Sequence, residues 1–96
     1  MEQLNPTVIA GLRTMARQEN SVPDMLREVI QQLGPQTAHT LTLARYLQES
    51  FGLRLHEVKP IGGWTADGKG ELSDTDLDQL IRPSIIHNRS RWDAAA

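Results

Sequence analysis

The chain has 96 residues and a formal charge of −2, and 39% of its residues are hydrophobic. This length predicts a single domain, residues 1–96, with a modest core. The absence of cysteine excludes disulfides, zinc sites built on thiolates and thiol catalysis.

Only four residues are aromatic, so the core has to be built from aliphatic side chains. Such a supply favours helices, since strands draw on aromatic and β-branched residues. We therefore predict an all-α fold, a small bundle of four to six short helices with an irregular loop near residues 61–72. Residues 94–96 are expected to fray as a tail.

Proline openings and glycine stops mark the first two predicted helices. In NPTVIAGLRTMARQ, Asn5 is a candidate N-cap and Pro6 suits the first helical position. In SVPDMLREVIQQLG, Ser21 is the candidate N-cap and Gly34 ends the helix. Apolar residues recur at helical spacing in both segments, which predicts that each helix buries one face.

The segment PQTAHTLTLARYLQESFG predicts a third helix, which ends where Gly52 supplies a left-handed residue. A short helix is expected near residues 55–60, followed by an irregular link, because Pro60 and the Gly62–Gly63 pair break any longer element. Trp64 is predicted to plug the side of the core at this link.

The last helical segment is predicted to begin at Ser73. Pro83 lies inside it and lacks the N–H of an ordinary helical residue, so it either kinks one helix or precedes a second helix that begins at Ser84. The apolar residues of the segment fall on one broad face: Leu77, Leu80, Ile81, Ile85 and Trp92.

Charge is unevenly distributed over this last third of the chain. Residues 79–96 have a net charge of +2, from three arginines and one aspartate. Residues 61–78 have a net charge of −4, because Lys69 stands against five acids: Asp67, Glu71, Asp74, Asp76 and Asp78. Negative charge near the start of a helix and positive charge near its end both favour the helix dipole.

Residues 65–76, TADGKGELSDTD, resemble an EF-hand calcium loop with Gly70 at its sharp turn. Three positions depart from that family: Thr65 replaces the first carboxylate, Lys69 puts an ammonium group at a ligand position, and Asp76 is one methylene shorter than the usual final glutamate. The resemblance implies a degenerate calcium site whose ligands would come from four residues: Asp67, Glu71, Ser73 and Asp76.

A turn that starts a helix explains the same residues with fewer assumptions. Asp67 and Gly68 form a turn pair, and Ser73 to Asp76 has the capping-box pattern, in which Ser73 accepts from the N–H near Asp76. We favour this interpretation, predict no bound metal, and keep the calcium loop as an alternative.

The stretch YLQESFGLRLHEV resembles the middle of a helix-turn-helix, with Gly52 in the turn. The resemblance implies a DNA-binding regulator, although Gln48 stands where such motifs have a small residue. Residues 1–60 have no net charge, so they supply no general attraction to nucleic acid. We expect no nucleic-acid partner and keep DNA binding as an alternative, in which the second helix presents Arg54, His56, Glu57 and Lys59.

The sequence contains neither a secretion signal nor an apolar stretch long enough to cross a bilayer. We expect a cytoplasmic protein without a membrane partner. No histidine or serine stands in a known catalytic spacing, and no glycine-rich stretch has the phosphate-binding order. An enzyme and a cofactor are therefore not expected.

The expected function is that of a small non-catalytic protein–protein interaction or regulatory domain. Its partner would be another protein chain or a second copy of itself. Aromatic and arginine residues are enriched at interfaces, and the candidate contact residues lie near the end of the chain: Ile86, Arg89, Arg91 and Trp92. For Trp92, sealing the last helix against the core is the simpler role.

Overall fold

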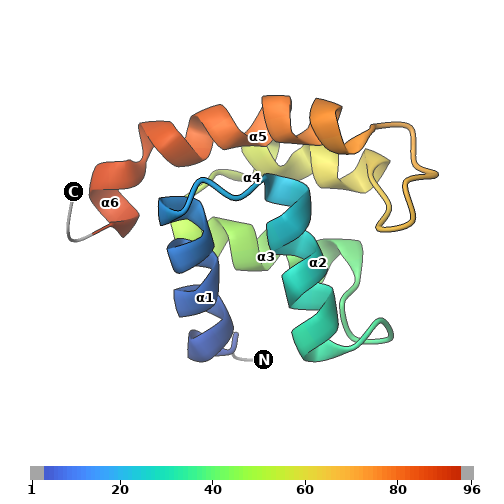
Figure 1. Ribbon diagram of the computed structural model, residues 1–96, viewed down its shortest axis with the longest axis horizontal. Coiled ribbons are helices and arrows are strands. Elements are labelled where there is room, and N and C mark those ends of the chain that lie inside the picture. The colour runs from blue at the N-terminus through green and yellow to red at the C-terminus, as the bar shows by residue number, and fades with distance from the viewer. Residues whose placement is uncertain (1–3, 94–96) are drawn as a thin grey trace.

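A computed structural model describes residues 4–93 of the chain, so the predicted tail at 94–96 lies outside the described residues. The predicted all-α fold is confirmed: six α-helices and one 3₁₀-helix, with no strand, form residues 4–93 (Figure 1). The elements are α1 (Pro6–Arg17), α2 (Val22–Leu33), α3 (Thr40–Phe51), α4 (Leu55–Val58), η1 (Lys59–Gly63), α5 (Asp74–His87) and α6 (Arg89–Trp92).

The predicted helix starts are confirmed in atomic detail. Asn5 Oδ1 accepts from the N–H of Thr7 at 2.9 Å, and Ser21 Oγ accepts from the N–H of Asp24 at 3.3 Å. These caps satisfy backbone donors that have no partner inside the helix. Gly52 ends α3 in the left-handed conformation, with φ of 66° and ψ of 33°.

The helices form two layers with α5 across one end (Figure 1). α1 and α2 lie side by side, α3 lies behind them, and α5 runs along their upper ends in this view. The one-turn helix α4 and η1 pack between α3 and α5. The Cα radius of gyration is 12.2 Å, close to the roughly 13 Å of a compact chain of about 100 residues.

The core is aliphatic, as predicted, and both tryptophans join it. Trp64 is 5% exposed and closes the side of the core at the end of η1, where the sequence placed it. The largest fully buried side chains are Phe51, Leu12, Met25, Leu26, Leu47, Ile61, Leu77 and Ile81.

The last helix corrects one prediction, for Leu80, and decides between the two alternatives left open for Pro83. Leu80 was assigned to the buried face but is 53% exposed, because α5 packs on the body along one side only. No new helix begins at Ser84: α5 continues through Pro83 to His87, and the break comes at Asn88. Pro83 is exposed, so water can satisfy the carbonyl of Gln79 that a proline leaves without its helical donor.

The irregular loop is shorter than predicted, because its first residues form η1. Residues 59–63 make a 3₁₀-helix in which Pro60 occupies the first turn, and irregular backbone runs only from Trp64 to Ser73. Within residues 4–93, none of the helices combines the length and the apolar character needed to span a membrane.

Candidate functional site

The turn between α5 and α6 is fixed by Asn88, which is 8% exposed. Its Nδ2 donates to the carbonyl oxygens of Phe51, at 3.1 Å, and Gly52, at 3.0 Å. Both carbonyls belong to the end of α3, where helical carbonyls lack a partner in their own helix. Asn88 therefore ties the C-terminal segment to α3 and sets the position of Trp92.

Trp92 packs in the core, which is the simpler of the two roles considered for it. It is 6% exposed, and its ring meets Phe51 edge to face with centroids 5.1 Å apart. Its Nε1 donates to the carbonyl oxygen of Ile85 at 2.8 Å. The indole is thus held by both an aromatic contact and a hydrogen bond.

One side of the Trp92 indole borders a cavity of about 150 Å³, which we call the Trp92 cavity. Its floor consists of the buried side chains of Met25, Ile85 and Trp92. Its rim carries more exposed and mostly polar residues: Ala16, Glu19, Asn20, Arg82, Ile86 and Arg89. Ile86 is 61% exposed, so an apolar side chain stands at the mouth of a hollow with an apolar floor.

Ion pairs hold both arginines of the rim, Arg89 and Arg82, in place. Arg89 Nε lies 3.0 Å from Oδ2 of Asp93, while Arg17 Nε lies 3.0 Å from Oδ1 of the same carboxylate. Asp93 is 2% exposed, but the Arg89 side chain is 50% exposed. The positive charge of Arg89 is therefore anchored on the body and still open to solvent.

Arg82 is anchored in the same manner. Its guanidinium pairs with Asp78 at 2.8 Å. Asp78 Oδ1 also accepts from the N–H of Val22 at 2.8 Å, so a side chain of α5 caps the first turn of α2. This bond crosses 56 residues of sequence, and no local pattern predicted it.

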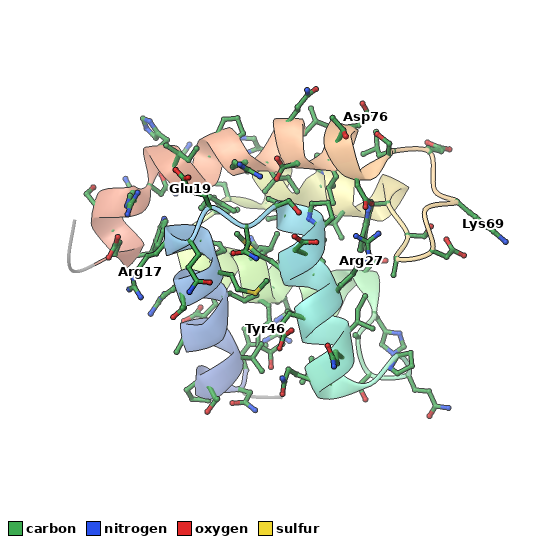
Figure 2. The ribbon with its side chains drawn as sticks, in the orientation of Figure 1. Arg17, Glu19, Arg27, Tyr46, Lys69 and Asp76 are labelled. Atoms are coloured by element: carbon green, nitrogen blue, oxygen red, sulfur yellow. The ribbon has the colours of Figure 1, made fainter. Side chains whose placement is uncertain are left out.

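Glu19, also on the rim, has a left-handed backbone with φ of 63°. The N–H of Asn20 bonds to the carbonyl of Met15 and that of Glu19 to the carbonyl of Ala16, which is a Schellman ending of α1. Glycine usually occupies this position, because other residues are strained there. Figure 2 shows Glu19 at the end of α1. Its left-handed conformation has no signal in the sequence beyond the short link before the Ser21 cap.

The structure brings three of the four predicted contact residues, Ile86, Arg89 and Trp92, to the Trp92 cavity. Arg91 lies apart from them. It lines a second hollow of about 250 Å³, the polar pocket, with Gly52, Arg54, His56, Glu57, His87 and Asn88.

Three residues of the helix-turn-helix alternative, Arg54, His56 and Glu57, also line the polar pocket. The N–H of Arg54 donates to Glu57 Oε1 at 2.9 Å, and this bond, followed by one from Ser84, lowers the pKa of Glu57 below its ordinary value. The helix that would read DNA, α4, has four residues and is about 6 Å long. Lys59 falls in η1, so the four residues do not share one helix.

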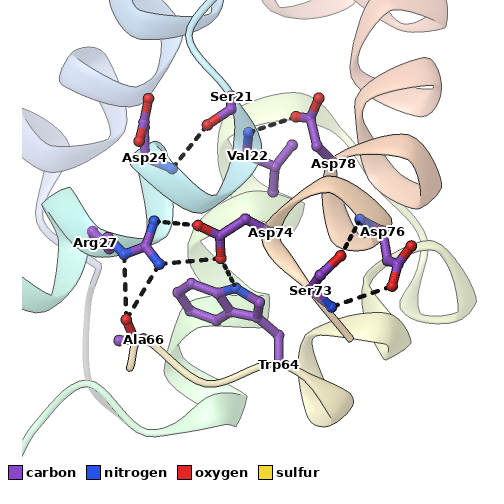
Figure 3. Close-up of polar contacts among 10 residues, drawn as sticks. All are labelled: Ser21, Val22, Asp24, Arg27, Trp64, Ala66, Ser73, Asp74, Asp76 and Asp78. Carbon is purple, nitrogen blue, oxygen red and sulfur yellow. Dashed lines mark hydrogen bonds and ion pairs between the residues drawn. The ribbon is translucent and has the colours of Figure 1, made fainter. Parts of the chain in front are cut away.

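The calcium-loop residues serve the local backbone. Asp67 Oδ1 accepts from the Thr65 hydroxyl at 2.6 Å and the Lys69 N–H at 2.9 Å, and these bonds lower the pKa of Asp67. Ser73 and Asp76 exchange the predicted capping-box bonds, at 3.1 and 3.3 Å (Figure 3). Glu71 is exposed. Residues 4–93 contain no group of three or more His, Asp or Glu side chains placed to hold a metal ion.

The loop is instead anchored through Asp74 (Figure 3). Asp74 Oδ2 lies 2.8 Å from Arg27 Nη1, and Oδ1 accepts from Trp64 Nε1 at 2.9 Å. The bond from Arg27, and then that from Trp64, lowers the pKa of Asp74. Arg27 also lies over the Trp64 ring, 5.4 Å from its centroid, and donates to the Ala66 carbonyl.

A broader hollow of about 900 Å³ lies open between α1 and α3. Its Arg13 donates to the carbonyl of Ser50 at 2.8 Å, so this arginine holds α1 against α3. Of the hollows in the described part of the chain, the Trp92 cavity joins a buried apolar floor to anchored charges, and we take it as the candidate site.

The chain has no match among protein families, curated proteins or solved structures.

Proposed function

We propose that the chain is a non-catalytic protein-interaction domain that binds a partner segment at the Trp92 cavity. The segment carries one aliphatic or aromatic side chain beside a carboxylate. The observation that supports this is a cavity of about 150 Å³ whose floor is apolar and whose rim carries two anchored arginines, Arg82 and Arg89.

The size of the cavity suits one side chain. An apolar cavity of about 150 Å³ accommodates a molecule of the size of benzene. Met25, Ile85 and Trp92 would contact such a group with carbon atoms. Burying a leucine or phenylalanine side chain contributes about 1.5–3 kcal/mol.

The rim supplies orientation and charge. Arg89 is half exposed, and Arg82 is 34% exposed, so both can approach a carboxylate of the partner without leaving Asp93 and Asp78. Ile86 extends the apolar contact outward from the cavity. Apolar centres with arginine on the rim are typical of protein interfaces.

A binding role also agrees with the chemistry of the lining. Among residues 4–93, the side chains that line the Trp92 cavity include no serine and no histidine. The two arginines that line it are engaged by carboxylates, Arg82 by Asp78 and Arg89 by Asp93. These bonds hold side chains in place, which is what a preformed docking surface requires.

The test uses a ¹⁵N-labelled chain and a blocked peptide of leucine between two aspartates. We expect the peptide to shift the indole N–H signal of Trp92 with a dissociation constant of about 1 mM, and to leave that of Trp64 unchanged. A peptide with lysines in place of the aspartates, or with alanine in place of the leucine, should shift neither of the two indole N–H signals. Equal shifts with the lysine peptide, or none with the aspartate peptide, would overturn the proposal.

Two matched variants complete the test. Ile86→Asp places a negative charge at the rim and should abolish the Trp92 shift. Leu41→Asp makes the same change at another exposed site, 67% exposed on α3, and should leave the shift intact. Loss of binding in both variants would assign the effect to net charge instead of the cavity.

A further inference from the structure

The outer face of α5 carries a line of exposed residues that we call the α5 ridge: Asp76, Leu80, Pro83 and His87. They recur every three or four residues, so they share one side of the helix. Figure 2 shows Asp76 directed away from the body, and in Figure 1, in the same orientation, none of the drawn helices lies above α5. Leu80 is 53% exposed on this ridge, so about half of its surface is left uncovered by residues 4–93.

The two ends of the ridge differ in charge. Asp76 stands at the start of α5, close in sequence to the exposed acids Asp67 and Glu71. Beyond the other end lies the polar pocket, where Arg54 and Arg91 face a single acid, Glu57. Parallel copies of α5 would place like charges together, whereas antiparallel copies place each acidic end beside a basic one.

We propose that two copies of this chain associate through their α5 ridges in antiparallel orientation, with Asp76 of each copy entering the polar pocket of the other beside Arg91. Such a pair has two-fold symmetry, so each contact occurs twice. The Trp92 cavity plays no part in it, and the two proposals stand or fall separately.

The spacing of the ridge fits this arrangement. If the two-fold axis passes between Pro83 and Ser84, then Asp76 lies about 6 Å beyond His87 of the second copy along the helix, where that copy's polar pocket begins. By the same count Leu80 lies level with His87, whose ring can cover it. The two Asp76 side chains would then lie about 22 Å apart along the paired helices, one on each side of the apolar centre.

The association should be weak and sensitive to salt. One leucine and one proline from each copy give only a small apolar centre. Exposed ion pairs contribute little and are weakened by salt, which screens charges over a length of about 10 Å at 0.1 M. We expect sedimentation equilibrium at low ionic strength to show a monomer–dimer equilibrium that shifts towards monomer as salt is added. A strict monomer at every concentration at low salt would overturn the proposal.

Charge reversal gives the sharper test. Asp76→Arg and Arg91→Asp should each weaken association at least tenfold, because each puts like charges together at both ends of the pair. An equimolar mixture of the two variants should recover a heterodimer, since the 76–91 contacts then become Arg–Asp at both ends. A variant that has lost its fold cannot recover in this way, so failure of the mixture would count against the proposed pairing.

Matched controls change charge elsewhere. Glu71→Arg and Lys69→Asp repeat the two changes of net charge on the loop, outside the ridge, and should leave a larger share of dimer than the ridge variants. Leu80→Ser should abolish the dimer and leave the peptide shift at Trp92 unchanged, which separates this proposal from the proposed function. If the wild-type chain is monomeric and binds inorganic phosphate or duplex DNA through Arg91, the polar pocket is an anion site and the pairing is wrong.

Discussion

Asp74 Oδ1 accepts a 2.9 Å hydrogen bond from Trp64 Nε1, while Oδ2 of the same carboxylate pairs with Arg27 at 2.8 Å. One side chain at the start of α5 therefore holds both the loop and α2. Asp74 is 46% exposed and Arg27 is 39% exposed, so solvent screens the ion pair and reduces its contribution.

Replacing this carboxylate should destabilise the protein measurably. We expect Asp74→Ala to lower the free energy of unfolding by about 1–2 kcal/mol, since it removes two charge-assisted bonds and leaves the Trp64 N–H without its acceptor. Urea denaturation followed by circular dichroism measures the change. Glu71→Ala, a loss of the same charge at an exposed loop position, should change the stability by less than about 0.5 kcal/mol.

Acid should weaken the fold through the same carboxylate. Hydrogen bonds lower the folded-state pKa of Asp74, Glu57 and Asp67 below the ordinary values of 3.8 for Asp and 4.5 for Glu. A lowered pKa contributes stability that is complete above the unfolded-state pKa and is lost as the pH falls through the folded-state pKa.

We therefore expect these three groups to leave the free energy of unfolding unchanged at neutral pH and to lower it below about pH 4. Urea titrations at a series of pH values measure the slope. Asp74→Asn should make the slope shallower in this acid range, and an unchanged slope would show that Asp74 titrates alike in the folded and unfolded chains.

Glycine at position 19 should stabilise the protein. Glu19 has φ of 63°, and a residue with a Cβ in this conformation costs about 1–2 kcal/mol. Because glycine also loses more backbone entropy on folding, we expect a net gain of about 0.5–1 kcal/mol for Glu19→Gly in thermal unfolding. The preceding Gln18 has φ of −83°, so Gln18→Gly should destabilise the protein instead.

Alanine should have opposite effects at two glycines. A Cβ on Gly70 would lie 2.6 Å from the Gly63 carbonyl oxygen, so Gly70→Ala should destabilise the protein by about 1–3 kcal/mol. A Cβ on Gly11, inside α1, would meet nothing within 4 Å, and Gly11→Ala should stabilise the protein by about 1 kcal/mol. Denaturant midpoints compare the two directly. A gain in stability for Gly70→Ala would mean that the loop does not pack against the end of η1.

The parts of the fold that depend on neighbouring residues were predictable from the sequence. The caps at Asn5, Ser21 and Ser73 each act within three residues, and the left-handed Gly52 ends its own helix. Short-range patterns of this kind carry their own physical cause, which is the set of unpaired donors and acceptors at a helix end.

Features that depend on packing between distant segments were missed. Helical spacing placed Leu80 on a broad apolar face, but spacing does not tell how much of that face a neighbour covers. Asp78 caps α2 across 56 residues and Arg17 reaches Asp93 across 76, and neither bond has a local signal. For the candidate site, the sequence picked out Ile86, Arg89 and Trp92, while Met25 and Glu19 joined them only in three dimensions. That these residues bind a partner stays a prediction.

The closed base of the loop has a practical consequence. The N–H of Leu72 donates to the carbonyl of Gly63 at 2.8 Å, so the segments that enter and leave the loop are joined at its base. The loop projects from the body beyond this point (Figure 1). The tip, at Gly68 and Lys69, is exposed. A short epitope or a fluorophore-binding sequence inserted between these two residues would begin and end at nearly the same place, and would leave the helices undisturbed.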